Sequence, residues 1–364
     1  METIRILIIE DDEDQQALYS SCIREYNKEH PDYEIIPTQL NSINDYFKSM
    51  FDNSYDALIA DITLGNDCSG NIAIEKTMNS CRLPVFVVSG DFNKLSVQNQ
   101  ESFLFRKYNR DGDFYTILDE IVGIYNTGYS RALALGGKLE ELISKVYWDY
   151  LNDKQLPFTY CDPKTKENRV LRYTLSRISD ILKINDQEKH DAYNASECVI
   201  IPPIGNEMYP GDVIEYNGED YIVISADCDV ENGKSDYITL CGLNPEYYTN
   251  FTKRCVPGYS NNVKSEIQKH VNNNVARYHL IPATSRFKGN VIDFQQVVSI
   301  KKEEILSATK KATVSSEFMK DIRFRFSSYY GRQGQPQLIS DEIIEQICKY
   351  NENNSAENME MQPV

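Results

Sequence analysis

The chain has 364 residues and a formal net charge of −17 at pH 7, with 38 Lys and Arg against 55 Asp and Glu. Most of the acidity lies near the N-terminus, because residues 1–125 contain 10 basic and 22 acidic side chains. Such an acidic chain is a poor general binder of nucleic acid. No apolar stretch approaches the roughly 18 residues of a membrane-spanning helix, and the nine cysteines form no metal-binding pattern. We therefore expect a cytoplasmic protein of two or three domains, with neither a membrane nor a nucleic acid as its partner.

Two apolar runs in the first third of the chain end in carboxylates. Residues 4–9 lead into the acidic residues 10–12, and residues 57–60 lead into Asp61. Continuous apolar runs of this length are typical of strands that are buried on both faces of a parallel sheet. The carboxyl ends of such strands share one edge, where ligands bind. Carboxylates gathered there repel one another unless a cation binds, and hard oxygen ligands favour Mg²⁺.

Two further apolar runs follow, and each also ends in a polar residue. Residues 83–88 lead into Ser89, and residues 103–106 lead into Lys107. An acidic pair, an aspartate, a hydroxyl and a lysine, each after an apolar strand and in that order, resemble the receiver domain of bacterial response regulators. The resemblance covers residues 1–127 and implies a flavodoxin-like, doubly wound α/β fold.

The resemblance also implies a role for each of these residues. Asp61 becomes the phosphoryl acceptor, Ser89 would hydrogen-bond the phosphoryl group, and Lys107 would pair with it. Oxygen atoms of four residues would hold Mg²⁺: Glu10, Asp11, Asp61 and, through its carbonyl group, Thr63. A carboxylate is a weak nucleophile, so its attack on phosphorus requires that the metal and the lysine neutralise the accumulating charge.

The phosphoryl donor is expected to be another protein. The chain has four histidines, and none lies near the receiver motifs. A histidine kinase or a phosphotransfer protein is therefore the expected partner. Tyr108 follows the lysine where the family usually has proline, and Leu104 stands where the family usually has an aromatic switch residue. These departures leave open a degenerate receiver that acts as a docking protein, or a phosphate sink.

Residues 128–152 are predicted to form a linker that contains an amphipathic helix. Its apolar residues recur at helical spacing: Leu139, Leu142, Ile143, Val146, Tyr147, Tyr150 and Leu151. One interpretation is a signalling or dimerisation helix, which would make a second copy of the chain a partner. The other is that the helix packs on the core of the following domain, and the shortness of the run favours this interpretation.

Residues 153–350 are predicted to form an α+β output domain, and residues 351–364 a disordered tail. Asp212–Tyr216 and Asp220–Ser225 flank Asn217-Gly218, which is the pattern of a type I′ hairpin. Short strands with such turns suggest a small β-barrel element of SH3-like size.

The output domain shows no helix-turn-helix, zinc-finger or phosphate-cradling pattern. Asp227, Cys228 and His279 form one speculative second site, because a cysteine beside a histidine could be an activated thiolate. The alternative is that the thiol is an ordinary buried cysteine and the Asp-Cys-Asp segment a turn. The order of elements looks like that of uncharacterised domains attached to bacterial signalling or defence modules.

The sequence therefore predicts a two-component response regulator, a phosphoprotein in which phosphorylation of Asp61 controls a non-classical output domain or an effector protein. A defence signalling system is one setting. We expect no enzymatic activity beyond the phosphoacceptor chemistry. The alternatives are the docking protein or phosphate sink, and a phosphorylation-regulated effector enzyme that uses Cys228 and His279.

Overall fold

The structure is a computed structural model of the whole chain. It describes residues 1–52, 54–65, 67–97, 101–152, 162–184, 192–231, 235–272, 274–332 and 336–360. The chain divides into two compact units, Met1–His190 and Asp191–Val364, and we describe each by itself. The segment predicted as a linker, 128–152, belongs to the first unit. Among the described residues, no helix is both long and apolar enough to cross a membrane.

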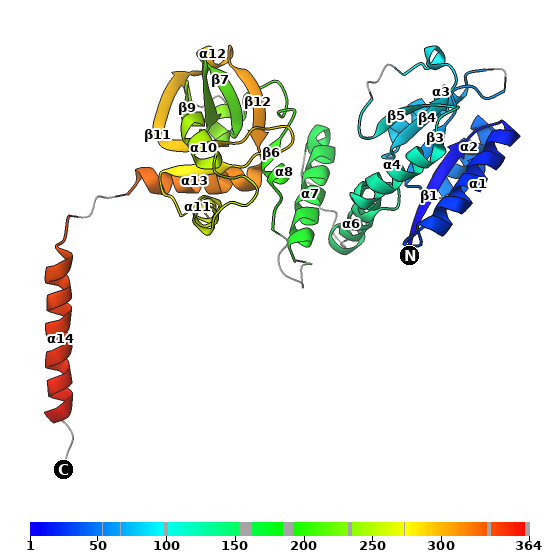
Figure 1. The fold of residues 1–364 in the computed structure, drawn as a ribbon. Coiled ribbons are helices and arrows are strands. Elements are labelled where there is room, and N and C mark those ends of the chain that lie inside the picture. Colours follow the sequence, from blue (N-terminus) through cyan, green and yellow to red (C-terminus); the bar gives the residue numbers. More distant parts are fainter. Residues whose placement is uncertain are drawn as a thin grey trace. The chain divides into compact units, whose positions relative to one another are not determined.

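The first unit begins with alternating strands and helices and ends with helices alone (Figure 1). Its elements in chain order are β1 (Glu2–Ile9), α1 (Glu13–Glu29), β2 (Tyr33–Leu40), α2 (Ile43–Asp52), β3 (Ala57–Ala60), α3 (Gly70–Ser80), β4 (Val85–Ser89), η1 (Phe92–Lys94), β5 (Phe105–Asn109), α4 (Phe114–Asn126), α5 (Tyr129–Leu133), α6 (Lys138–Val146), η2 (Tyr147–Leu151), η3 (Pro163–Thr165) and α7 (Lys166–Ile184).

The five strands of the first unit form one parallel sheet in the order β2-β1-β3-β4-β5. The chain moves outward from β1 to β2 and then returns to the other side of β1, so the order reverses between β1 and β3. In open α/β sheets, ligands bind at the carboxyl ends of the strands beside this reversal. There Ile9 of β1 pairs with Ala60 of β3. The predicted flavodoxin-like, doubly wound fold is confirmed.

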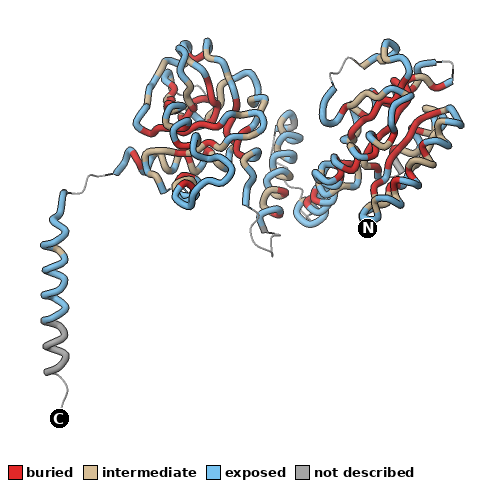
Figure 2. The backbone as a smooth tube through the Cα atoms, in the orientation of Figure 1, coloured by how far each residue is buried: buried red, intermediate tan, exposed pale blue. Residues whose placement is uncertain are grey.

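Each face of the sheet has its own apolar core (Figure 2). Side chains alternate between the two faces of a strand. Ile6 and Ile8 of β1 therefore face the core that contains α1 and α4, whereas Leu7 and Ile9 face the core that contains α2 and α3. Burial on both faces explains why β3 and residues 6–9 of β1 are continuously apolar in sequence.

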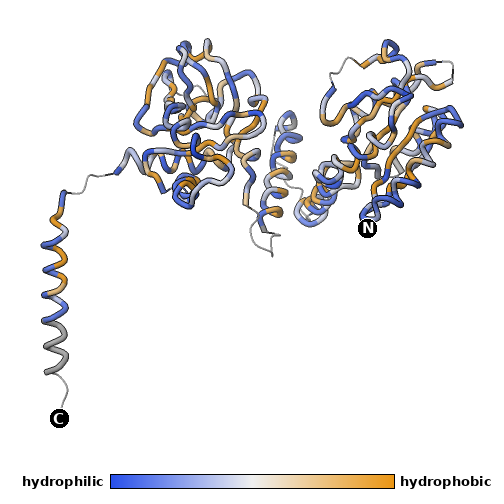
Figure 3. Tube along the Cα trace, viewed as in Figure 1, coloured by the Kyte–Doolittle hydropathy of each residue, from blue (hydrophilic) through white to orange (hydrophobic). Residues whose placement is uncertain are grey.

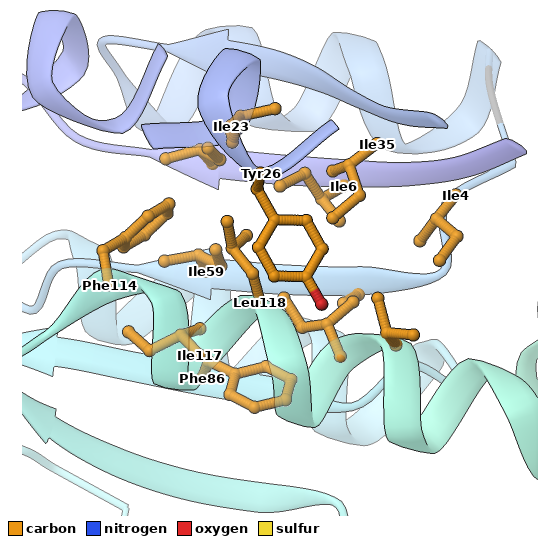
Figure 4. Close-up of a cluster of buried hydrophobic side chains, with 14 of the residues drawn as sticks. Ile4, Ile6, Ile23, Tyr26, Ile35, Ile59, Phe86, Phe114, Ile117 and Leu118 are labelled. Carbon is orange, nitrogen blue, oxygen red and sulfur yellow. The ribbon is translucent and has the colours of Figure 1, made fainter. Parts of the chain in front are cut away.

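Tyr26 of α1 is among the largest fully buried side chains in the described part of the chain. Figure 4 shows its ring among Ile6, Ile35 and Leu118, in the core between the sheet and the helices. Its hydroxyl donates a hydrogen bond of 2.8 Å to Oδ1 of Asp119 on α4. A buried tyrosine needs such a partner, so this bond fixes α4 against α1.

The amphipathic helix α6 packs against α7 within the first unit. Leu142 and Val146 are buried in a small cluster with Ile178 and Ile181 of α7. Tyr150, in the π-helical turn η2 that follows α6, is 45% exposed. The periodicity of the sequence identifies the apolar face, but it carries no information about the partner of that face.

The second unit combines an antiparallel sheet with helices (Figure 1). Its elements in chain order are α8 (Ala195–Cys198), β6 (Val199–Ile200), β7 (Asp212–Tyr216), β8 (Glu219–Val223), α9 (Asp227–Glu231), β9 (Tyr237–Leu243), α10 (Pro245–Thr252), α11 (Asn261–Val271), β10 (Tyr278–Ile281), β11 (Asn290–Lys301), α12 (Lys302–Ile305), β12 (Thr309–Val314), α13 (Ser316–Tyr330) and α14 (Ser340–Glu360).

The strands of this unit pair in the order β10-β11-β9-β8-β7-β12-β6. β7 and β8 form the predicted hairpin, and both turn residues have the positive φ of a type I′ turn, 52° at Asn217 and 82° at Gly218. The α+β class is confirmed. The SH3-like barrel is not confirmed, because the described strands form a single seven-stranded sheet.

The main core of the second unit lies between the sheet and α13, whose Met319, Ile322 and Tyr329 are buried there. Figure 3 shows that apolar residues recur along the strands of this unit. The last helix, α14, continues past Asn351, where the sequence predicts a disordered tail. Residues 361–364 of that predicted tail lie outside the described residues.

Candidate functional site

Three carboxylates meet at the carboxyl edge of the parallel sheet. Glu10 follows β1 and is 1% exposed, Asp61 follows β3 and is 4% exposed, and Asp11 is half-buried. One ligand oxygen from each lies within 4.8 Å of the others. The pairing of Ile9 with Ala60 places the ends of β1 and β3 side by side, which brings these residues together. The structure thus confirms that Glu10, Asp11 and Asp61 converge.

Backbone N–H groups fix the orientation of two of these carboxylates. The N–H of Ile62 donates to Oδ1 of Asp61 at 2.8 Å, and the N–H of Gly65 donates to Oδ2 of Asp11 at 2.6 Å. Asp12 has a different function, because it caps α1 by accepting hydrogen bonds from the first turn of that helix. Asp12 therefore has a structural role, whereas Glu10 and Asp11 contribute their carboxylates to the site.

Arg110 supplies a cation to this site that sequence analysis does not identify. Its Nη2 atom lies 2.6 Å from Oδ2 of Asp61 and 3.1 Å and 3.2 Å from the two carboxylate oxygens of Glu10. One nitrogen therefore bridges two buried carboxylates. Arg110 directly follows β5, and its own N–H donates to the carbonyl of Ser89 at 3.3 Å, which holds it at the edge of the sheet.

Burial and charge shift the protonation of these groups. Burial raises the pKa of Glu10 to about 7, even though a backbone hydrogen bond and Arg110 act in the opposite direction. Burial also raises the pKa of Asp61, against the effects of Arg110 and two backbone hydrogen bonds. Burial alone would lower the pKa of Arg110, but the carboxylates of Glu10 and Asp61 raise it above its ordinary value. Arg110 therefore offsets part of the effect of burial on the two carboxylates, but burial is the larger effect and the pKa of each stays raised.

The other predicted site residues occupy different positions. Ser89 is buried at the end of β4, and its Oγ accepts a hydrogen bond of 3.3 Å from the N–H of Asp91. Lys107 lies inside β5, where it pairs with Val87, and its ammonium group lies 5.9 Å from the centre of the Phe105 ring. Arg110, not Lys107, is the cation in contact with Asp61. The roles of Ser89 and Lys107 toward a phosphoryl group stay predictions, as does the metal-binding role of the Thr63 carbonyl.

The residues at this edge fit a bound Mg²⁺. The converging donors are all oxygens, they belong to carboxylates, and two of the three are buried. A second observation is the hydroxyl of Tyr19 on α1, which is buried and has no hydrogen-bond partner among the described residues. Burial raises the pKa of this hydroxyl, and the charge of Glu10 raises it further. An oxygen-rich edge with an unused hydroxyl suits a hydrated hard cation.

The speculative second site is not assembled as predicted. Asp227 accepts two hydrogen bonds from the guanidinium of Arg323, at 2.8 Å and 3.1 Å. Cys228 is exposed on α9. His279 is buried on β10, and its Nδ1 atom lies 2.5 Å from Nη1 of Arg325. Since arginine can only donate, this nitrogen of His279 must be the acceptor.

A cavity of about 530 Å³ lies beside His279. Its described lining includes Cys198, His270 and Phe318, but not Cys228. Burial raises the pKa of the Cys198 thiol to about 11, which makes a reactive thiolate unfavourable at neutral pH. The cavity therefore does not support a Cys–His nucleophile in the described part of the second unit.

Several solved structures match the N-terminal third of the chain. No family model matches the chain, and no curated protein matches it. Among solved structures, the chain is similar to a CheY-like response regulator receiver domain from Methylobacillus flagellatus, with 18% identity and a TM-score of 0.28 over 34% of this chain and 99% of that one. A receiver domain of a sensor histidine kinase from Pseudomonas aeruginosa, solved with magnesium in its active-site cleft, has 15% identity and a TM-score of 0.28 over 34% and 98%.

A third similar structure is the response regulator protein TrrA from Thermotoga maritima in complex with Mg²⁺ and BeF, with 17% identity and a TM-score of 0.26 over 33% and 98%. We base the fold assignment on the strand order β2-β1-β3-β4-β5 and on the acidic edge of the sheet. These features define the first unit as a flavodoxin-like domain of the kind that includes receivers.

Proposed function

We propose that this protein is a response regulator whose first unit accepts a phosphoryl group on Asp61 in the presence of Mg²⁺. The observation that carries the proposal is the convergence of Glu10, Asp11 and Asp61 within 4.8 Å at the carboxyl edge of the sheet. Of these three, Asp61 is the residue that follows a strand buried at every position, and, like Glu10, it contacts Arg110. The donor would be a histidine kinase or a phosphotransfer protein.

The reaction is the transfer of a phosphoryl group from a histidine nitrogen of the donor protein to a carboxylate oxygen of Asp61. A carboxylate oxygen of Asp61 forms a bond to phosphorus, and the bond from phosphorus to the donor atom breaks, so that the donor leaves with the electron pair. A bound Mg²⁺ would neutralise charge on the phosphoryl oxygens. The backbone N–H of Ile62 holds Asp61 in place through Oδ1, while Oδ2 faces Arg110. Ionisation of Asp61 is required for attack, and Arg110 favours it.

The role of the acidic neighbours follows from their charge. Glu10 and Asp11 would oppose an approaching phosphoryl dianion unless a cation lies between them. They are therefore better suited to hold Mg²⁺ than to accept the phosphoryl group. Phosphorylation would add a charge of about −1.5 to −2 to this edge, which the second unit or an effector protein would then detect.

A phosphoryl mimic tests the proposal through stability. The parent protein should melt at a higher temperature with Mg²⁺ and beryllium fluoride together than with Mg²⁺ and fluoride alone, because a ligand that binds only the folded state stabilises it. Asp61→Asn should show no such shift. Asp67→Asn, which removes an exposed carboxylate from the loop after β3, is the matched control and should respond as the parent does. The absence of any shift in the parent would contradict the proposal.

A further inference from the structure

The position of Arg110 carries an inference that rests on the proposed function and concerns the regulation of the same site. The atom Nη2 contacts Asp61 at 2.6 Å and both oxygens of Glu10 at 3.1 Å and 3.2 Å. Glu10 and Asp61 are also two of the three residues whose oxygens converge as a metal-binding set. The guanidinium and a metal ion would therefore compete for the same carboxylates.

Charge explains why the two cations exclude each other. Two positive charges a few ångströms apart repel strongly in a partly buried site. The Glu10 and Asp61 carboxylates are almost fully buried, so little solvent screens that repulsion. The Arg110 side chain is 30% exposed. The residue lies in a turn, which is closed by the hydrogen bond from the N–H of Gly112 to the carbonyl of Asn109. It therefore has an open side toward which it can move.

Unused donors around the site indicate what Arg110 does after it moves. Its Nε is buried and has no hydrogen-bond partner among the described residues, and the same holds for the hydroxyl of Tyr19. Arginine presents a planar fork of donors that matches phosphoryl oxygens. An anion on Asp61 would supply acceptors that these donors otherwise lack.

We propose that Arg110 is a resident counter-cation that holds Glu10 and Asp61 when Mg²⁺ is absent, yields this position when Mg²⁺ binds, and then pairs with the phosphoryl group on Asp61. Arg110 thereby raises the Mg²⁺ concentration that is needed to fill the site. It also takes the position at the phosphoryl group that the sequence pattern predicts for Lys107.

Calorimetric titration of the full-length protein with MgCl₂ tests whether Arg110 competes with Mg²⁺. Arg110→Gln removes the competing charge and should bind Mg²⁺ more tightly than the parent by on the order of tenfold. Arg110→Lys keeps the charge and should bind Mg²⁺ about as weakly as the parent, which also keeps the test valid if Arg110→Gln folds poorly. Arg106→Gln is the matched control, because Arg106 lies on β5, the strand that Arg110 follows, and pairs at 3.2 Å with Glu120, away from the site.

The pairing of Arg110 with the phosphoryl group is tested by the initial rate of phosphoryl transfer from acetyl phosphate at saturating Mg²⁺. Arg110→Gln should react more slowly by on the order of 100-fold, as expected when a donor to developing charge is lost. Arg106→Gln should react at the parental rate.

The outcomes separate the two proposals. Equal Mg²⁺ affinity in the parent and in Arg110→Gln, with binding lost in Asp61→Asn, would overturn the role of Arg110 and leave the metal site intact. An unchanged transfer rate in Arg110→Gln would overturn its role at the phosphoryl group. The absence of Mg²⁺ binding in every variant would overturn both the metal site and the competition.

Discussion

Gly70, the first residue of α3, lies against the main chain of Asp61, the proposed phosphoacceptor. A Cβ built on Gly70 would overlap the carbonyl oxygen of Asp61 and would also come within 2.8 Å of the carbonyl oxygen of Ile62. Backbone atoms cannot rotate out of the way as a side chain can, so even one methyl group forces α3 and the end of β3 apart. The start of α3 thus fixes the position of Asp61.

We expect Gly70→Ala to lower the free energy of unfolding by about 1–3 kcal/mol, which is the usual cost of overpacking. It should also reduce Mg²⁺ affinity, because Asp61 moves away from its neighbours. Gly123→Ala is the control: a Cβ there meets nothing within 4 Å, and the exposed helical site should gain about 0.5–1 kcal/mol. Chemical denaturation of both variants checks the prediction, and a neutral Gly70→Ala would contradict it.

The packing of α6 on α7 predicts different results for two adjacent residues. Leu142 is 4% exposed in the cluster with Ile178 and Ile181, whereas Ile143 is 43% exposed. Leu142→Asp buries an unpaired charge and should cost about 3–5 kcal/mol of stability. Ile143→Asp should change stability by less than about 0.5 kcal/mol. Trp148, the single tryptophan, lies close to this cluster in sequence. Its fluorescence is therefore used to follow the unfolding of the two variants. Equal melting of the two variants would show that this face is not buried.

His279 predicts a pH dependence of stability. Burial, followed by the positive charge of Arg325, lowers its pKa to about 3, although the carboxylate of Asp321 lies 3.8 Å from the same nitrogen. The unfolded chain takes up a proton near pH 6.5 and the folded chain does not. The contribution of His279 is therefore fully present above pH 6.5 and is lost as the pH falls toward about 3.

The expected loss is about 1.4 kcal/mol per pH unit below pH 6.5. His279→Gln keeps an acceptor for Arg325 but does not titrate. The difference in unfolding free energy between the parent and His279→Gln, measured by denaturation at several values between pH 7 and pH 4.5, should shift in favour of the variant as the pH falls. A difference that is constant with pH would show that His279 takes up its proton over the same pH range in the folded and the unfolded protein.

The acidic part of the site could be predicted from the sequence because it depends on strand ends alone. Glu10, Asp11 and Asp61 follow strand segments that are buried on both faces, residues 6–9 and 57–60, and both segments are apolar throughout, which makes their ends visible in the sequence. The carboxyl ends of parallel strands then share one edge. No knowledge of register was needed to bring these residues together.

Arg110 could not be predicted in the same way. It follows β5, which lies at the edge of the sheet and is only partly buried, so its residues Phe105–Asn109 are mostly polar. The apolar run ends at Arg106, three residues before the strand does. The register places Asn109 opposite Ser89 and Lys107 opposite Val87, and this register determines which cation reaches Asp61.

In the second unit, local signals were reliable and long-range ones were not. The Asn217-Gly218 turn was predictable because type I′ geometry needs positive φ at both residues. The way seven strands pair depends on contacts far apart in sequence, so the proposed barrel did not follow from the hairpin. For the same reason, the sequence could not establish whether Cys228 approaches His279.

Intact-mass spectrometry after incubation with acetyl phosphate and Mg²⁺ tests the central claim most directly. We expect one phosphoryl adduct on the parent protein and none on Asp61→Asn, whose amide keeps the size of the side chain but is not a nucleophile. Omitting Mg²⁺ and adding a chelator should strongly reduce the adduct on the parent. An adduct that persists on Asp61→Asn, or a parent that acquires none from acetyl phosphate, would contradict the assignment of Asp61 as the phosphoryl acceptor.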